Sequence, residues 1–168
     1  MKRIAINILL MILAFTIQNG IFPLIPFLSA SPNLLLILTF SYGFIYGKDA
    51  GMFYGLFAGI LLDLFYSGPF GFYTLLFMNI GYFNGIFTKY YYDDYITLPL
   101  ILSLVNEIVY NSYIYIFRFL IRNRLDLLYY LKEIIIPETI FTTVTTLLLY
   151  RFFLFISRKM EEMENRRD

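Results

Sequence analysis

Long uncharged stretches dominate the chain. Residues 4–47 contain no charged side chain, and further apolar stretches cover 64–88, 139–150, and 95–117 with Glu107 as the single interruption. A helix of residues 4–47 would be about 66 Å long, roughly twice the 30 Å hydrocarbon core of a bilayer. We therefore expect two membrane crossings in the first stretch and further crossings in the others.

The pattern predicts six helices in an all-α, polytopic membrane bundle, a single integral-membrane domain over residues 1–168. A proline-rich and polar turn near 23–33 separates the first two helices, and residues 67–71 have the composition of a chain reversal. Pro32 and Pro137 suit the first turns of helices. The second and third helices are short for a full crossing, as tilted, broken or re-entrant helices buried in protein are. The expected helices cover 4–22, 33–47, 50–66, 70–88, 95–117 and 137–156.

The composition supports this class and removes several chemistries. Hydrophobic residues make up 60% of the chain and charged residues only 15%, whereas a soluble domain is about 45–50% apolar and about 25% charged. The absence of cysteine and histidine excludes disulfides, thiol and histidine catalysis, and Cys/His zinc sites. Basic residues do not alternate with the aromatic residues on a polar face, so we expect no nucleic-acid partner. No cofactor motif occurs.

The basic residues predict the orientation. Six crossings place both termini on one side, and the side with more Lys and Arg faces the cytoplasm. Both termini are therefore expected in the cytoplasm, with residues 125–131 forming a short helix at the outer interface. A five-span arrangement, with the ends on opposite sides, is the alternative. The basic residues of the terminal side are Lys2, Arg3, Lys48, Lys89, Arg151, Arg158, Lys159, Arg166 and Arg167, and those of the other side are Arg118, Arg122, Arg124 and Lys132.

Glycine recurs at every fourth position along the third predicted helix. In lipid, helices associate through close packing and hydrogen bonds, and small residues allow two backbones to approach most closely. The same spacing occurs on the fourth helix, so we expect the third and fourth helices to form a tight pair. Docking of another protein's helix on this stripe is the alternative. The glycines are Gly47, Gly51, Gly55 and Gly59, followed by Gly81 and Gly85.

Two carboxylates stand in apolar surroundings. Asp63 continues the four-residue count of the glycines, and a carboxylate near the end of a membrane helix is costly if it faces lipid. We expect it to cap backbone groups of the 67–71 reversal, with a proton or ligand site and a partner contact as alternatives. Glu107, with Asn111 one turn later, is expected in a buried polar cluster inside the bundle. A proton-relay site is the alternative for Glu107.

These residues resemble a known family. Residues 32–37 are followed by Gly47 and Gly51, then by residues 55–63, which end in Asp63, and by the turn 68–71 with Pro69 and Gly71. This order of segments is similar to that of the rod shape-determining protein MreD family. The motif-bearing part covers residues 32–85.

The resemblance implies a non-enzymatic scaffold of the bacterial cell-elongation machinery, in the cytoplasmic membrane. Such a protein binds MreC, a bitopic membrane protein, and helps to couple MreB filaments to peptidoglycan synthesis by RodA and its transpeptidase. The alternative is a substrate-binding S component of an energy-coupling-factor vitamin transporter, a similar six-helix fold. An S component would carry an Ala-x-x-x-Ala surface on its first helix, whereas this chain has Ala5 and Ala14 nine residues apart.

Overall fold

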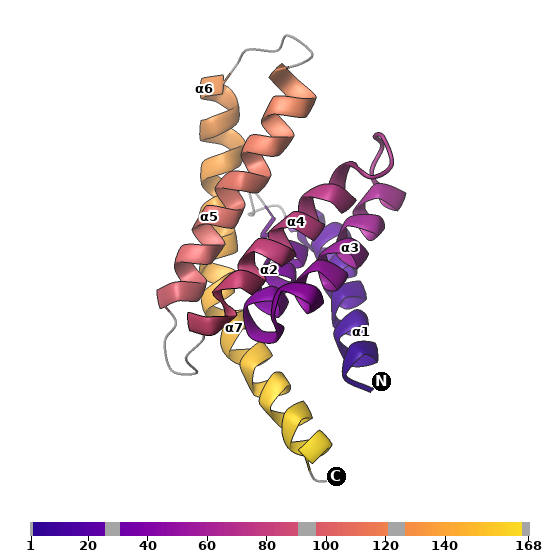
Figure 1. The fold of residues 1–168 in the computed structure, drawn as a ribbon. Coiled ribbons are helices and arrows are strands. Elements are labelled where there is room, and N and C mark those ends of the chain that lie inside the picture. Colours follow the sequence, from indigo (N-terminus) through magenta and orange to yellow (C-terminus); the bar gives the residue numbers. More distant parts are fainter. Residues whose placement is uncertain (1, 26–30, 91–96, 121–126, 166–168) are drawn as a thin grey trace.

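The computed structural model describes residues 2–25, 31–90, 97–120 and 127–165, and all regular structure within them is helical (Figure 1). The α-helices are α1 (Lys2–Thr16), α2 (Leu34–Tyr46), α3 (Lys48–Phe65), α4 (Phe72–Ile86), α5 (Thr97–Ile114), α6 (Leu127–Tyr130) and α7 (Ile136–Asn165). Five short π or 3-10 segments extend or join them, namely η1 (Ile17–Ile21), η2 (Phe22–Leu24), η3 (Phe87–Tyr90), η4 (Tyr115–Leu120) and η5 (Leu131–Ile135).

Three helical stretches of the described residues are long and apolar enough to cross a membrane. They are Arg3–Leu24, Thr97–Arg118 and Leu128–Ile156. Each exceeds the roughly 20 residues that a crossing needs. In Figure 1 the first stretch begins, and the last stretch ends, toward the same end of the bundle.

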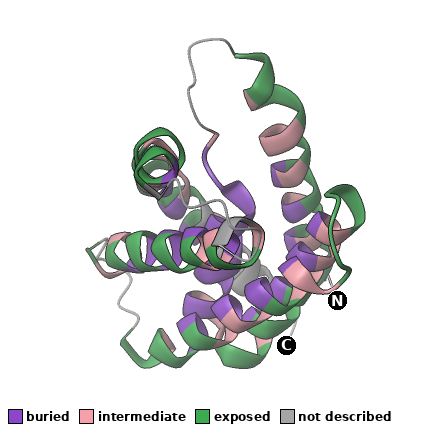
Figure 2. Ribbon diagram, turned by 90° about the horizontal axis from the view of Figure 1, so that it is seen from above, coloured by how far each residue is buried: buried purple, intermediate pink, exposed green. Residues whose placement is uncertain are grey.

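The other three helices are short, and α2 lies at the centre of the bundle. With 13, 18 and 15 residues, α2, α3 and α4 are about 20 to 27 Å long, less than the roughly 30 Å of a hydrocarbon core. α2 contacts α1, α3, α4, α5 and α7. Every residue of α2 from Leu34 to Phe44 is buried, and Figure 2 shows the exposed residues on the outward sides of the surrounding helices. Protein rather than lipid therefore surrounds the short central helix.

The sixth predicted helix differs most from the structure. A helix beginning at Pro137 and a separate interfacial helix over 125–131 were expected, but α6, η5 and α7 follow one another without a break, and the residues at both junctions have helical backbone angles. Proline lacks the N–H that a helix interior needs. The π-helical segment η5 ends two residues before Pro137, and local π-helical turns of this kind satisfy the backbone groups that a proline leaves unpaired in membrane helices.

Several predicted features lie outside the described residues. The charge pattern included Arg122, Arg124, Arg166 and Arg167, and part of the 23–33 turn covers residues 26–30. The interfacial helix included Leu125. Pro32 precedes Asn33, the N-cap of α2, and so stands just outside the helix.

Glycines from three helices meet at one point. A Cβ atom on Gly51 of α3 would lie within 3.0 Å of the Gly81 carbonyl group of α4 and of the Cα atom of Gly43 of α2. A Cβ atom on Gly81 would meet the carbonyl group of Gly51 at similarly close range. Because Cβ atoms do not approach backbone atoms this closely, only glycine permits the contact. Gly43 was not among the predicted residues, although it continues the same four-residue spacing by one step.

The α3–α4 contact continues along both helices. Cβ atoms on Gly55 and Gly59 would lie within 3.0 Å of the backbones of Phe77 and Thr74, and one on Gly85 would meet the backbone of Lys48. Gly51, Gly55 and Gly59 are buried, so α2 and α4 cover this stripe. Gly47 has another role, because it ends α2 and precedes α3 with a φ of 94°, a conformation that favours glycine.

Gly55→Ala is expected to lower the free energy of unfolding by about 1 to 3 kcal/mol, because the new methyl group would overpack the α3–α4 contact. Gly20→Ala is the matched control, since a Cβ atom there meets nothing within 4 Å and alanine favours the helix by up to about 1 kcal/mol. Thermal unfolding of the purified proteins in detergent measures both. Equal stability of Gly55→Ala and the wild type would show that the two backbones are not in close contact at this position.

Candidate functional site

Asp63 caps the N-terminus of α4. Its carboxylate accepts hydrogen bonds from the backbone N–H groups of Gly71, Tyr73 and Thr74 at 2.9, 2.9 and 3.0 Å. The hydroxyl of Thr74 donates a fourth, at 2.6 Å. The first N–H groups of a helix have no partner within the helix, and a carboxylate also interacts favourably with the positive end of the helix dipole. Asp63 thereby fixes the start of α4 against the end of α3.

The turn between α3 and α4 is held from both sides. Gly71 is the N-cap residue of α4 and has a φ of 97°, which favours glycine. Pro69 precedes it, and its carbonyl accepts from the backbone N–H of Phe72 at 3.2 Å. Arg118 reaches over from η4 and donates to the carbonyl of Ser67 at 3.0 Å. The turn therefore has a fixed conformation although Phe70 is 70% exposed.

The N-terminus of α2 is capped by polar side chains inside the bundle. The Asn33 side chain accepts from the N–H of Leu36 at 3.2 Å, and Gln18 accepts from the N–H of Leu35 at 3.2 Å. The backbone N–H of Asn33 donates to the hydroxyl of Thr142 at 3.0 Å. Unpaired backbone groups are costly where no water reaches them, so these caps allow a short helix to begin within the protein.

A polar pocket of about 300 Å³ opens beside these two caps. Tyr66 of its wall directly follows α3, and its hydroxyl donates to the side-chain carbonyl of Asn19. Two carboxylates, Glu133 and Glu138, line the same cavity, and no basic side chain is among its described lining residues. The lining residues are Gln18, Asn19, Pro23, Ser31, Tyr66, Tyr110, Glu133, Ile134 and Glu138. Such a cavity favours a ligand or partner group that carries positive charge or hydrogen-bond donors.

Glu107 and Asn111 lie together in the bundle interior. Glu107 is 0% and Asn111 1% exposed. The Asn111 amide donates to the Glu107 backbone carbonyl at 3.1 Å and to one carboxyl oxygen at 3.3 Å. The other carboxyl oxygen of Glu107 has no hydrogen-bond partner among the described residues. Buried polar groups need hydrogen-bond partners, and Asn111 supplies one for a single carboxyl oxygen of Glu107.

Three further polar contacts that the sequence analysis did not predict join the helices. Asn7 of α1 donates to the Tyr54 hydroxyl of α3 at 2.9 Å, and the hydroxyls of Ser103 and Thr146 join α5 to α7 at 2.9 Å. Asn84 and Asn106 join α4 to α5. The sequence offered a signal, because asparagine in an apolar helix needs a partner. The part of the chain that the structure describes contains no group of three or more potential metal ligands.

The sequence of the chain matches a known protein family. The family model for the rod shape-determining protein MreD matches residues 1–160 of the chain. The chain belongs to the MreD family. Neither a curated protein nor a solved structure is significantly similar to it.

Membership in the MreD family means a role in determining rod shape, in a family whose members are generally not enzymes. The match extends well beyond residues 32–85, the part on which the resemblance rested. Those residues form α2, α3 and most of α4, the three helices that meet at the glycine contact. In this member of the family, Pro69, Gly71 and Asp63 form one capped turn beside the polar pocket.

Asp63→Asn is expected to destabilise the bundle by about 0.5 to 2 kcal/mol, the usual cost of losing a helix cap. Asparagine would replace one acceptor oxygen by an NH₂ group, which cannot accept from the N–H groups of α4. Asp49→Asn is the control, because it makes the same charge change in the exposed first turn of α3. Chemical or thermal unfolding in detergent compares the two. If Asp63→Asn and Asp49→Asn unfold alike, the cap does not contribute to stability.

Proposed function

We propose that this MreD-family protein is a non-enzymatic scaffold of the cell-elongation machinery, which binds an MreC-like bitopic membrane protein. Through this partner it would act together with RodA and its transpeptidase in peptidoglycan synthesis, and indirectly with MreB. The family match over residues 1–160 supports the proposal. The protein would reside in the bacterial cytoplasmic membrane, with six crossings and both termini in the cytoplasm.

The partner would bind at the polar end of the bundle, where the pocket and the Asp63 turn lie. The pocket is built from segments far apart in sequence: the end of the first helical stretch, the residue after α3, the last third of α5, and η5 with the start of α7. A partner that enters it would contact several helices at once, so that binding would depend on the folded bundle. The acidic wall favours a basic segment of the partner, and an orientation with cytoplasmic termini would place this end at the outer surface.

The fixed turn adds a second contact surface beside the pocket. Phe70 is exposed on the turn, while its neighbours Pro69 and Gly71 are held by hydrogen bonds to the start of α4 and to Asp63. A preformed, exposed aromatic side chain binds a partner at little cost in conformational entropy. The pocket would supply charge complementarity, and Phe70 would supply apolar contact area.

Reversal of charge at the pocket is expected to weaken partner binding. Glu133 lines the pocket but is exposed, so Glu133→Lys should leave folding intact while it places like charge against a basic segment. Co-purification of the MreC-like protein from membranes with equal amounts of each variant is expected to fall about tenfold or more, because an unfavourable charge contact costs several kcal/mol. Asp49→Lys, an exposed acid on another part of the bundle, should bind normally. Normal binding of Glu133→Lys would remove the pocket from the interface.

Depletion in a rod-shaped host tests the function itself. Cells are expected to become round and wide. A copy with a fluorescent protein fused after Asp168 should restore rods. It should also fluoresce, because the fluorescent protein folds only in the cytoplasm. Growth that an added vitamin restores, in cells of normal shape, would instead support the S-component alternative. A fusion that restores rods without fluorescence would place the C-terminus outside.

A further inference from the structure

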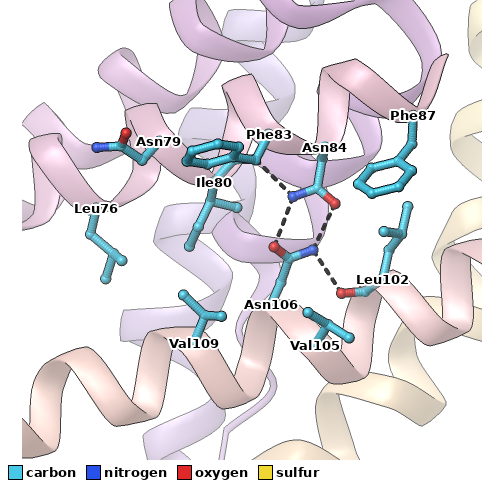
Figure 3. Close-up of a pocket in the computed structure, with 10 residues that line it drawn as sticks. All are labelled: Leu76, Asn79, Ile80, Phe83, Asn84, Phe87, Leu102, Val105, Asn106 and Val109. Carbon is cyan, nitrogen blue, oxygen red and sulfur yellow. Dashed lines mark hydrogen bonds between the residues drawn. The ribbon is translucent and has the colours of Figure 1, made fainter.

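A second cavity lies outside the polar end, as a groove between α4 and α5. Its volume is about 260 Å³. Figure 3 shows apolar side chains of both helices converging on it, with two asparagines between them. Several of its side chains are exposed on the surface of the bundle, including Phe83 at 57% and Val105 at 50%. The lining residues are Leu76, Asn79, Ile80, Phe83, Asn84, Phe87, Leu102, Val105, Asn106 and Val109.

The polar groups in this groove are largely engaged with one another. The Asn84 and Asn106 amides donate to each other's carbonyl oxygens at 2.7 and 2.8 Å, and each also donates to a backbone carbonyl of its own helix at 2.7 Å (Figure 3). Asn79 donates to the carbonyl of Leu75 at 2.7 Å. Few hydrogen-bonding groups therefore remain for a polar ligand. The walls instead match a hydrocarbon chain, which needs no hydrogen bonds.

A lysine stands near one end of the groove. Phe87 lines the groove and begins η3, and Lys89 follows two residues later. Lys89 is exposed, and its ammonium lies 4.8 Å from the ring centroid of Tyr90. Lys48 lies at the same end, because its backbone packs against Gly85. Lysine and tyrosine at the end of a membrane helix are typical of the headgroup region.

We propose that the groove between α4 and α5 binds one acyl chain of an anionic phospholipid, whose phosphate contacts Lys89. The apolar walls hold the chain, and the lysine selects the headgroup, since a single basic residue near an anionic lipid surface is worth about 1 kcal/mol. Lipid would in this way fill a space that α4 and α5 leave open, although the Asn84–Asn106 pair joins them. The proposal is independent of the partner proposed for the polar end.

The chain contains no tryptophan, so one introduced tryptophan reports on one site. Phe83→Trp places it at the groove and Phe152→Trp at a similarly exposed position of α7. Each protein is reconstituted into vesicles of phosphatidylcholine and phosphatidylglycerol, with bromine on the acyl chains of one lipid at a time to quench the fluorescence of a contacting tryptophan. At the groove we expect an about fivefold preference for phosphatidylglycerol, the effect of one lysine. The α7 position should show little preference.

Two further variants separate the possible outcomes. Adding Lys89→Gln to Phe83→Trp should abolish the preference, and Val109→Phe should reduce quenching at the groove alone, because it fills the space. The proposal would be overturned if both lipids quenched the groove tryptophan equally and Lys89→Gln did not change this quenching. Ordinary surrounding lipid would then occupy the groove. Quenching of the α7 tryptophan but not of the groove tryptophan would also overturn the proposal, since a second copy or a partner helix would then cover the groove.

Discussion

The close contact of three backbones at Gly43, Gly51 and Gly81 is the constraint on which the bundle depends. A bilayer provides no hydrophobic force between helices, so their association relies on van der Waals contact and on interhelical hydrogen bonds. Side chains at these positions would separate α2, α3 and α4 by the width of at least a methyl group. The contacts that continue along the α3–α4 pair at Gly55, Gly59 and Gly85 would then be lost as well. Glycine at these positions therefore allows the backbones of the three short helices to pack together as one unit.

Short helices in a membrane protein require partners for their ends. α2 and α4 begin inside or beside the bundle, and side chains satisfy their first N–H groups: the N-cap residue Asn33 and Gln18 of η1 for α2, and Asp63 of α3 for α4. A continuous membrane helix would not need these caps, because its ends reach the water-containing interface. The same polar residues that make the short helices possible gather at one end of the bundle, beside the polar pocket. Fold and candidate site therefore share their residues there.

The two cavities described above differ in the chemistry that they offer. The pocket at the polar end has acidic and amide groups in its wall and suits a basic protein segment. The groove between α4 and α5 has its amides paired with each other and suits a hydrocarbon chain. In the proposed scaffold, which would act by contact, such surfaces would be the functional features. An MreD-family protein of this kind would bind its partner at one and lipid at the other.

The sequence by itself determined the helical class, the long apolar helices and the glycine spacing, because hydropathy and four-residue periodicity are local properties of the chain. The series from Gly47 to Gly59 indicated a packing ridge, yet only the tertiary structure shows that Gly47 is a turn residue and that Gly43 packs against Gly81. Only the tertiary structure also shows that the helix continues through Pro137. Local sequence rules predict a helix start at this proline, but the helix already extends before it through the π-helical segment η5. Asp63 was expected to cap backbone groups of the 67–71 reversal; of its four donors only the Gly71 N–H lies there, and the other three belong to Tyr73 and Thr74 of α4. The polar pocket was not predictable, because Gln18, Tyr66 and Glu138 come together only when separate helices pack.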